Sequence, residues 1–335
     1  MLGIFAIFAA VTLSAGDHQV FAHRGASGYL PEHSLPAKAM AYAQGADFLE
    51  QDVVLTKDDV PIVLHDVHLD ALTDVAQRFP ERKRADGRFY ALDFTIHEIR
   101  QLKATQRFQH KTGKPAHPDQ FPLTGYTYQL HTLEEEIRFI QGLNASTGRN
   151  VGLFVEIKQP TFHSKEGRDI AKIVVDLLHE AGYGAGRQSP CWVQCFEKST
   201  LKRLRAELGW QGRLMMILSS KKLGADGSDY DQLSTADGLR ELAEFADGVF
   251  PSLDRVVSWN DHGEPIISAF TADARQAGLR VITGVVRQDD LPKHCPSVDA
   301  YHQAVIGKAR VNDICTDFPD LSVQWLKMHT AHEKH

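Results

Sequence analysis

The chain has few cysteines, no long hydrophobic run after its first fifteen residues and no cluster of basic residues. No later segment reaches the roughly 18 uninterrupted apolar residues of a membrane-spanning helix, so we expect no stable membrane insertion. The formal net charge is -6 without a basic run, which argues against nucleic acid as a partner. Hydrophobic residues make up 43% of the 335 positions, enough for a sizeable core. These features indicate a soluble globular protein.

The four cysteines do not suggest a disulfide framework or a zinc site. Cys191 and Cys195 lie in one apolar run, 191–196, which is typical of a strand. Four residues along a strand separate two side chains by about 13 Å, beyond the reach of a disulfide. The spacing also differs from that of a paired CxxC zinc site. We therefore expect the cysteines to be small, buried apolar residues.

The first fifteen residues are apolar and uncharged and end in the small-residue stretch Leu13-Ser14-Ala15. This pattern predicts a signal peptide over 1–15, cleavage near Ala15 and a periplasmic or secreted location. The alternative is a disordered or packed N-terminal arm. The mature domain is then expected to cover 16–330.

Short apolar runs alternate with amphipathic stretches along the mature chain. Eight runs are expected to be strands: 20–23, 48–56, 152–158, 191–196, 213–219, 247–252, 279–286 and 313–319. Helical patterns lie between most of them, including 34–44, 167–180, 199–208, 238–246 and 265–277. Eight such units predict a closed TIM (β/α)8 barrel, and a doubly wound open sheet is the alternative.

One segment, from about 68 to 128, breaks this alternation. It is rich in Lys, Arg, Asp, Gly, Pro and His and has only weak periodicity. It follows residues 61–66, which we expect to form a short extra strand. We interpret the segment as a small subdomain inserted after the second strand region, above the barrel, rather than as a separate domain.

Charged and polar side chains occur where the first two predicted strands end. His23 and Arg24 close the first strand, and together they offer a proton-transfer group and a guanidinium fork for phosphate. Glu50 and Asp52 are two apart on the second strand and therefore share a face. Two neighbouring carboxylates repel each other unless a cation lies between them, and a hard divalent ion fits that role. Solvated loop residues and surface acids are the plainer interpretations.

Two further groups extend this pattern. His65 ends the short extra strand, so a hairpin would bring it over the same end of the barrel. Glu156 and Lys158 share a face of the next strand, where Glu156 can complete an all-oxygen metal site. An exposed Glu-Lys pair of little energetic value is the alternative. Together, three carboxylates, two histidines and two cations suit attack on a phosphodiester.

The sequence resembles the bacterial periplasmic glycerophosphodiester phosphodiesterases across essentially the whole mature chain. The matching segments are 22–33 (AHRGASGYLPEH), 45–52 (GADFLEQD), 63–66 (VLHD), 131–136 (HTLEEE), 156–158 (EIK), 194–196 (QCF) and 316–320 (TDFPD). The resemblance implies a TIM barrel with an inserted subdomain. It also implies metal-dependent hydrolysis of glycerophosphodiesters to sn-glycerol 3-phosphate and an alcohol.

The resemblance also assigns residue roles. It implies that His23 and His65 are the catalytic histidines. The implied metal ligands are Glu50, Asp52 and Glu156, which hold a divalent cation that is expected to be calcium, with magnesium as runner-up. Arg24 and Lys158 are implied to be cations on the phosphate side, and we add Phe196 as a candidate substrate contact.

The chain departs from the family pattern on its seventh strand. Residues 281–287 (VITGVVR) stand where an aromatic-containing segment is usual, which puts substrate specificity in doubt. One rival function is a lysophospholipase D on the same scaffold, and another is a non-catalytic surface binding protein. A homodimer is a possible assembly.

Overall fold

A computed structural model describes residues 18–330, so the expected signal peptide over 1–15 lies outside the described residues. Eight parallel strands form a closed barrel in the order β1-β11-β10-β7-β6-β5-β4-β2, and β1 pairs with β2 to complete the ring. These strands are β1 (Val20–Ala22), β2 (Phe48–Leu55), β4 (Gly152–Ile157), β5 (Cys191–Cys195), β6 (Arg213–Leu218), β7 (Gly248–Pro251), β10 (Arg280–Val286) and β11 (Asp313–Thr316). The predicted TIM barrel is confirmed.

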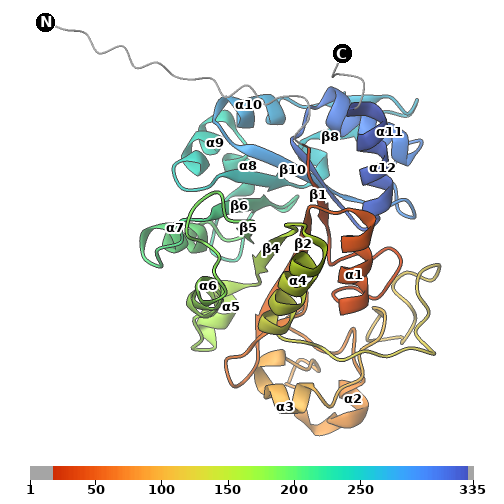
Figure 1. The fold of residues 1–335 in the computed structure, drawn as a ribbon, viewed down its shortest axis with the longest axis vertical. Coiled ribbons are helices and arrows are strands. Elements are labelled where there is room, and N and C mark those ends of the chain that lie inside the picture. The colour runs from red at the N-terminus through yellow and green to blue at the C-terminus, as the bar shows by residue number, and fades with distance from the viewer. Residues whose placement is uncertain (1–17, 331–335) are drawn as a thin grey trace, which may run out of the picture.

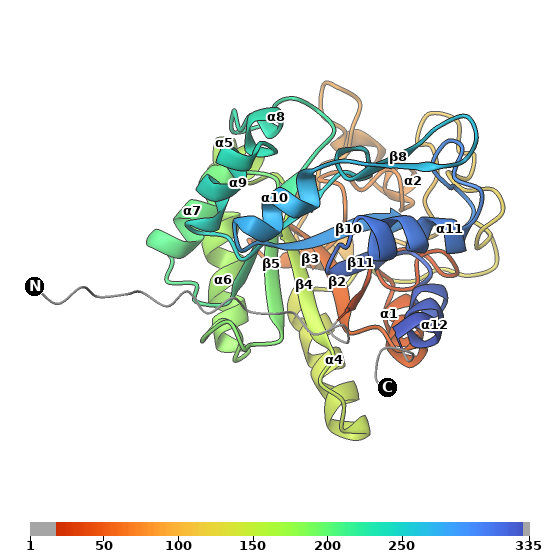
Figure 2. The same cartoon turned by 90° about the horizontal axis from the view of Figure 1, so that it is seen from above.

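Helices surround the strands (Figures 1 and 2). The longer ones are α1 (Leu35–Gln44), α4 (Leu133–Thr147), α6 (Ile170–Glu180), α7 (Lys198–Ala206), α9 (Ala236–Ala243), α10 (Phe270–Gln276) and α12 (Pro319–Thr330). Short helices are α5 (Pro160–Lys165), α8 (Tyr230–Leu233) and α11 (Val298–His302), the last followed by a π-helical turn over Gln303–Lys308. No helix within 18–330 is long and apolar enough to cross a membrane.

One predicted helix, 265–277, was wrong at its beginning. Pro265–Ile267 forms strand β9, which pairs antiparallel with β8 (Val257–Trp259), and the helix begins only at Phe270. The β-branched Ile266 and Ile267 favour extended backbone, and that local preference outweighs the helical spacing.

The barrel interior is filled by large side chains. Phe21, Phe48, Phe154, Trp192, Met215, Ile282 and Cys315 form one buried cluster. The rings of Phe21 and Phe48, on adjacent strands, stack at 4.6 Å. The four cysteines are free and buried, as predicted. This packed interior leaves polar residues to gather at the carboxyl ends of the strands.

Residues 68–128, which lie between β3 (Pro61–Val63) and α4, form a compact lobe that we refer to as the insertion. β3 pairs antiparallel with β2, and the insertion then contains α2 (Val75–Arg78), α3 (Ile96–Ile99) and two 3-10 turns, Pro80–Arg82 and Ala91–Asp93. Its apolar residues, including Leu69, Phe94 and Leu102, form a cluster that also takes in Val54 of β2 and Ile62 of β3. Figure 1 shows α2 and α3 at one end of the molecule, far from α9 and α10.

Candidate active site

The structure brings all eight predicted site residues to the carboxyl end of the barrel. They come from the ends of four strands and from the loop after β3: His23, Arg24, Glu50, Asp52, His65, Glu156, Lys158 and Phe196. Parallel strands place their carboxyl ends on one face, so residues distant in sequence become neighbours.

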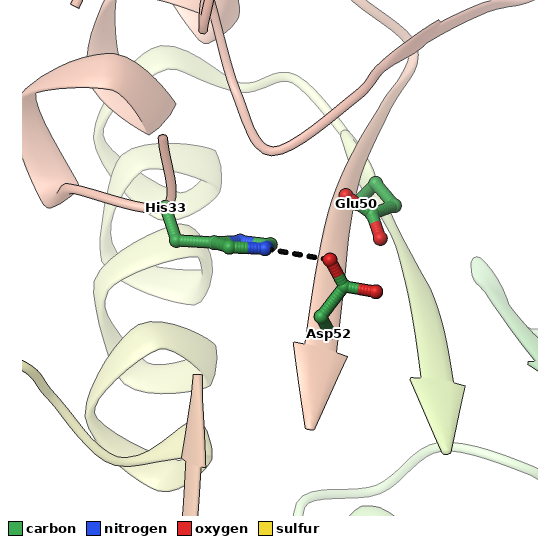
Figure 3. A group of neighbouring side chains, drawn as sticks. All are labelled: His33, Glu50 and Asp52. Atoms are coloured by element: carbon green, nitrogen blue, oxygen red, sulfur yellow. Dashed lines mark hydrogen bonds and ion pairs between the residues drawn. The ribbon is translucent and has the colours of Figure 1, made fainter. Parts of the chain in front are cut away.

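Glu50 and Asp52 form a buried acidic pair on β2. Nε2 of His33, in the loop before α1, lies 2.8 Å from Oδ2 of Asp52. Figure 3 shows the His33 ring directed at Asp52, with Glu50 nearer the beginning of the same strand. The ligand atoms of these three side chains lie within 4.8 Å of one another. The group has the size and composition of a divalent-metal site.

An observation on Asp52 tests whether a cation fits here. Oδ1 of Asp52 is buried and accepts no hydrogen bond, and its ion-pair partner, Nζ of Lys158, lies 3.4 Å away. A buried carboxylate oxygen without a donor is costly, and a hard cation satisfies it. Burial and the charge of Asp52 raise the pKa of Glu50 well above its usual range. A cation between the two carboxylates would relieve both the cost of burial and their mutual repulsion, as expected of a metal site.

Glu156 lies beside Asp52 because the two residues are register partners on β4 and β2. Its partner is Lys158, whose Nζ lies 2.8 Å from Oε1 of Glu156 and 3.4 Å from Oδ1 of Asp52. Burial raises the pKa of Glu156 to about 8, against the opposing charge of Lys158. Glu156 thus adjoins the group of His33, Glu50 and Asp52, and its role as a metal ligand stays a prediction.

Burial also acts to raise the pKa of Asp52. The charges of Lys158 and His65, together with the hydrogen bond to His33, outweigh it and hold that pKa well below its usual range. The three neighbouring carboxyl groups therefore differ in pKa, which is lowered at Asp52 and raised at Glu50 and Glu156. Carboxylates with such different affinities for protons are typical of functional sites.

Each predicted catalytic histidine is oriented by a carboxylate. Nδ1 of His23 lies 2.7 Å from Oδ1 of Asp317, just after β11, and Nδ1 of His65 lies 2.7 Å from Oδ1 of Asp66. Burial, followed by the charges of Arg24 and Lys158, lowers the pKa of His65 to about 4. A neutral imidazole with one nitrogen fixed by a carboxylate presents the other nitrogen for proton transfer.

Arg24 is held in an unusual backbone conformation with φ of 57°. Its backbone N–H donates to Oε2 of Glu50 at 2.7 Å, and its Nη1 donates to Oε1 of Glu32 at 3.0 Å. The following Gly25 has φ of 89°, and a Cβ there would lie 2.8 Å from the backbone of Ala37. The tight turn after β1 therefore requires glycine and directs Arg24 across the site.

Two hollows flank the acidic centre. One, of about 190 Å3, is lined by polar side chains that include His23, Arg24, Glu32, Arg107 and Arg287. The other, of about 350 Å3, is lined by residues that include His65, Glu156, Lys158, Phe196 and Leu223. Phe196 also lies near the ammonium of Lys158, 5.9 Å from the ring centroid. The two histidines thus open onto different hollows.

The site contains residues that our sequence reasoning did not single out. His33, Asp66 and Asp317 lie inside the quoted segments 22–33, 63–66 and 316–320, so the resemblance to the family was an available signal for them. Arg107 carries no such signal, because it lies in the aperiodic insertion.

Comparison with known proteins agrees with this geometry. A model of the glycerophosphoryl diester phosphodiesterase family matches residues 23–321. A glycerophosphodiester phosphodiesterase of Haemophilus influenzae is 38% identical over 335 residues, covering 94% of this chain and 92% of that protein. A glycerophosphodiester phosphodiesterase of Treponema pallidum is 36% identical over 342 residues, which cover 97% of this chain and 95% of that protein.

Solved structures show the same fold. A phosphodiesterase of Oleispira antarctica, in complex with the product sn-glycerol-3-phosphate, superposes with a TM-score of 0.63 at 18% identity, covering 92% of this chain and 96% of that one. A glycerophosphodiester phosphodiesterase of Agrobacterium tumefaciens superposes with a TM-score of 0.57 at 19% identity, covering 91% of this chain and 98% of that one.

Proposed function

The chain belongs to the glycerophosphoryl diester phosphodiesterase family and is a phosphoric diester hydrolase, and we propose that it cleaves glycerophosphodiesters to sn-glycerol 3-phosphate and an alcohol. The observation that carries the proposal is the convergence of two carboxylate-oriented histidines on a buried acidic centre. Fold alone would not assign an activity, because TIM barrels support many chemistries.

The site residues divide the work of hydrolysis. Arg24 and Lys158 neutralise the phosphate oxygens, and the guanidinium fork of Arg24 also orients them. One of His23 and His65 removes a proton from the attacking oxygen, and the other returns a proton to the leaving oxygen. Phe196, half-buried at the edge of the larger hollow, contacts the substrate. A bound divalent cation supplies Lewis-acid stabilisation of the developing negative charge.

We propose that Glu50, Asp52 and Glu156 hold this cation, with His33 fixing the orientation of Asp52. The all-oxygen set suits calcium, with magnesium as runner-up. The ammonium group of Lys158 forms ion pairs with Asp52 and Glu156. We propose that this ammonium group also faces the phosphate of the substrate.

An assay on glycerophosphocholine tests the function. Purified protein is expected to release sn-glycerol 3-phosphate and choline. This activity should be lost after treatment with chelator and restored by calcium. Lysophosphatidylcholine serves as the comparison substrate, since a lysophospholipase D would prefer it. Failure to cleave any glycerophosphodiester in the presence of calcium or magnesium would refute the proposal.

Two further proposals concern the whole protein. The apolar segment 1–15 supports export to the periplasm or the exterior, with a mature chain that begins near Gly16. N-terminal sequencing of the protein from its native host tests this, and a retained Met1 in the cytoplasmic fraction would contradict it. A homodimer is proposed as a possible assembly, and light scattering of the purified protein gives its mass directly.

A further inference from the structure

Arg107 belongs to the insertion, yet its guanidinium reaches the active site. Its Nε lies 2.7 Å from Oε2 of Glu32, and its Nη2 lies 2.8 Å from Oε1 of the same carboxylate. Its Nη1 lies 2.6 Å from Oδ2 of Asp66. All three nitrogens of one guanidinium therefore donate to two carboxylates, with the side chain only 19% exposed.

Both carboxylates act directly on proposed catalytic or binding groups. Asp66 fixes Nδ1 of His65 through its other oxygen, and Glu32 accepts from Arg24. A second insertion residue, Tyr128, donates its hydroxyl to the backbone oxygen of Glu32 at 3.1 Å. The side chain of Arg107 thus links Asp66, which holds His65, to Glu32, which holds Arg24.

We infer that Arg107 is a positioning residue that sets the His65 ring through Asp66 and the Arg24 guanidinium through Glu32. The inference rests on the proposed function of His65 and Arg24. The two carboxylates converge on one guanidinium, so without it they repel each other and the groups that they hold lose their alignment. A misplacement of about 1 Å in a site of this kind can cost about a hundredfold in rate.

The support of His23 has a different origin, which makes the role of Arg107 distinctive. Asp317 accepts from Nη1 of Arg287 at 2.7 Å, and both residues directly follow barrel strands. The carboxylate that holds His23 is thus held by the barrel residue Arg287, which reaches the insertion only through a 3.3 Å contact with Nδ1 of His117. The carboxylate that holds His65 is instead held directly by Arg107 of the insertion. The insertion supplies the alignment of one member of the acid–base pair.

Substitution of Arg107, with Arg88 as a matched control, tests the inference. Arg88 makes a similar fork inside the insertion, with Nε and Nη2 at 2.6 and 2.9 Å from the two oxygens of Asp70. These side-chain hydrogen bonds go to no site residue, and Arg88 acts on Asp66 only through its charge. We expect Arg107→Gln to lower kcat about 10- to 100-fold with KM changed less than about threefold. Arg88→Gln should leave kcat within about twofold of wild type.

Arg107→Lys separates charge from geometry. It keeps the positive charge but cannot donate to both carboxylates at once, so its kcat should also fall by about tenfold or more. If Arg107→Gln does not fold, this variant decides the matter. A normal kcat in a folded Arg107→Lys or Arg107→Gln protein would overturn the inference.

A double-mutant cycle with Asp66→Asn tests the route through Asp66. Arg107→Gln should reduce kcat at least about threefold less in the Asp66→Asn background than in wild type, because the two changes break one chain of contacts. Fully multiplicative effects would contradict that route.

A readout without turnover distinguishes failure of this inference from failure of the proposed function. In protein labelled with 15N-histidine, the ring signals of His65 should shift in Arg107→Gln and Arg107→Lys and stay unchanged in Arg88→Gln. Unchanged His65 signals in all three variants would overturn the inference even if wild type hydrolysed no diester.

Discussion

Oδ1 of Asp317 lies 2.7 Å from Nδ1 of His23, and this contact determines which ring nitrogen is available for chemistry. Nδ1 is engaged by the carboxylate, so Nε2 is the nitrogen left to exchange a proton with a substrate. Asp317 itself is buried, at 2% exposure, and is also held by Arg287. The His65–Asp66 pair repeats the arrangement on the other side of the acidic centre.

The histidine pair gives the most direct prediction. His23→Ala and His65→Ala should each lower kcat at least about a hundredfold, the usual contribution of general acid–base catalysis. KM should change less than kcat, because the phosphate contacts of Arg24 and Lys158 remain. His97, exposed on α3, is the control, and His97→Ala should keep full activity. Near-normal turnover in either site variant would assign that histidine a structural role.

Metal removal gives a second prediction. Treatment with chelator should abolish activity, and calcium should restore it more effectively than magnesium. Calcium at about 100 times its Kd should also raise the free energy of unfolding by about 2.7 kcal/mol in wild type. The gain should be much smaller in Asp52→Asn and Glu50→Gln, as measured by urea unfolding with and without calcium. Full activity in metal-free enzyme would contradict the prediction.

Glu136 of α4 should make stability depend on pH. It is fully buried, Lys38 Nζ lies 2.9 Å from its Oε1, and it accepts from Gln51 at the same oxygen. Burial acts to raise the pKa of Glu136, but Lys38 and His131 outweigh it and lower that pKa from 4.5 to about 2. A lowered folded-state pKa stabilises the protein above about pH 4.5, and the contribution is lost as pH falls toward 2.

Urea unfolding measures this contribution. Between pH 5.5 and 3, wild type should lose about 2 kcal/mol more unfolding free energy than Glu136→Gln, which has no carboxyl group to titrate. Glu134 is exposed on the same helix, so Glu134→Gln should follow wild type. Parallel pH profiles for wild type and Glu136→Gln would show that Glu136 is not the source of the effect.

Headgroup specificity should be broad. A choline-selective site needs an aromatic cage around the quaternary ammonium. Among the described residues that line the larger hollow, the Phe, Tyr and Trp side chains are Phe196 and Tyr230. The hydroxyl of Tyr230 donates a hydrogen bond to the backbone oxygen of Phe196. That pair does not enclose a cation on several sides. We therefore expect choline, ethanolamine and glycerol diesters to have kcat/KM values within about tenfold, or about 1.4 kcal/mol.

Comparison of the three substrates with bis(p-nitrophenyl) phosphate measures this range. The diester without glycerol should be much poorer, because polar groups that pair with the glycerol hydroxyls would go unpaired. A hundredfold preference for one headgroup would mean that the alcohol is recognised by other contacts.

The sequence by itself determined the barrel and most of its elements. Strands buried on both faces, such as β2, give continuous apolar runs, and eight of these alternating with helices permit few other topologies. The chemistry at strand ends was also visible, since Glu50 and Asp52 had to share a face by the twofold period of a strand. The error at Pro265–Ile267 came from helical spacing in a segment of strand-forming residues.

Only the tertiary structure decided which groups support the predicted site. Asp317 and His23 are 294 residues apart, and they meet because β11 and β1 pair at the closure of the barrel. His33 reaches Asp52 from a loop in which its own backbone is left-handed. Arg107 contacts Asp66 from the insertion, whose sequence has no regular hydrophobic period. Periodic patterns record which face of an element is buried. They do not record which distant loop docks on the site, because loop docking depends on packing between elements rather than on local sequence.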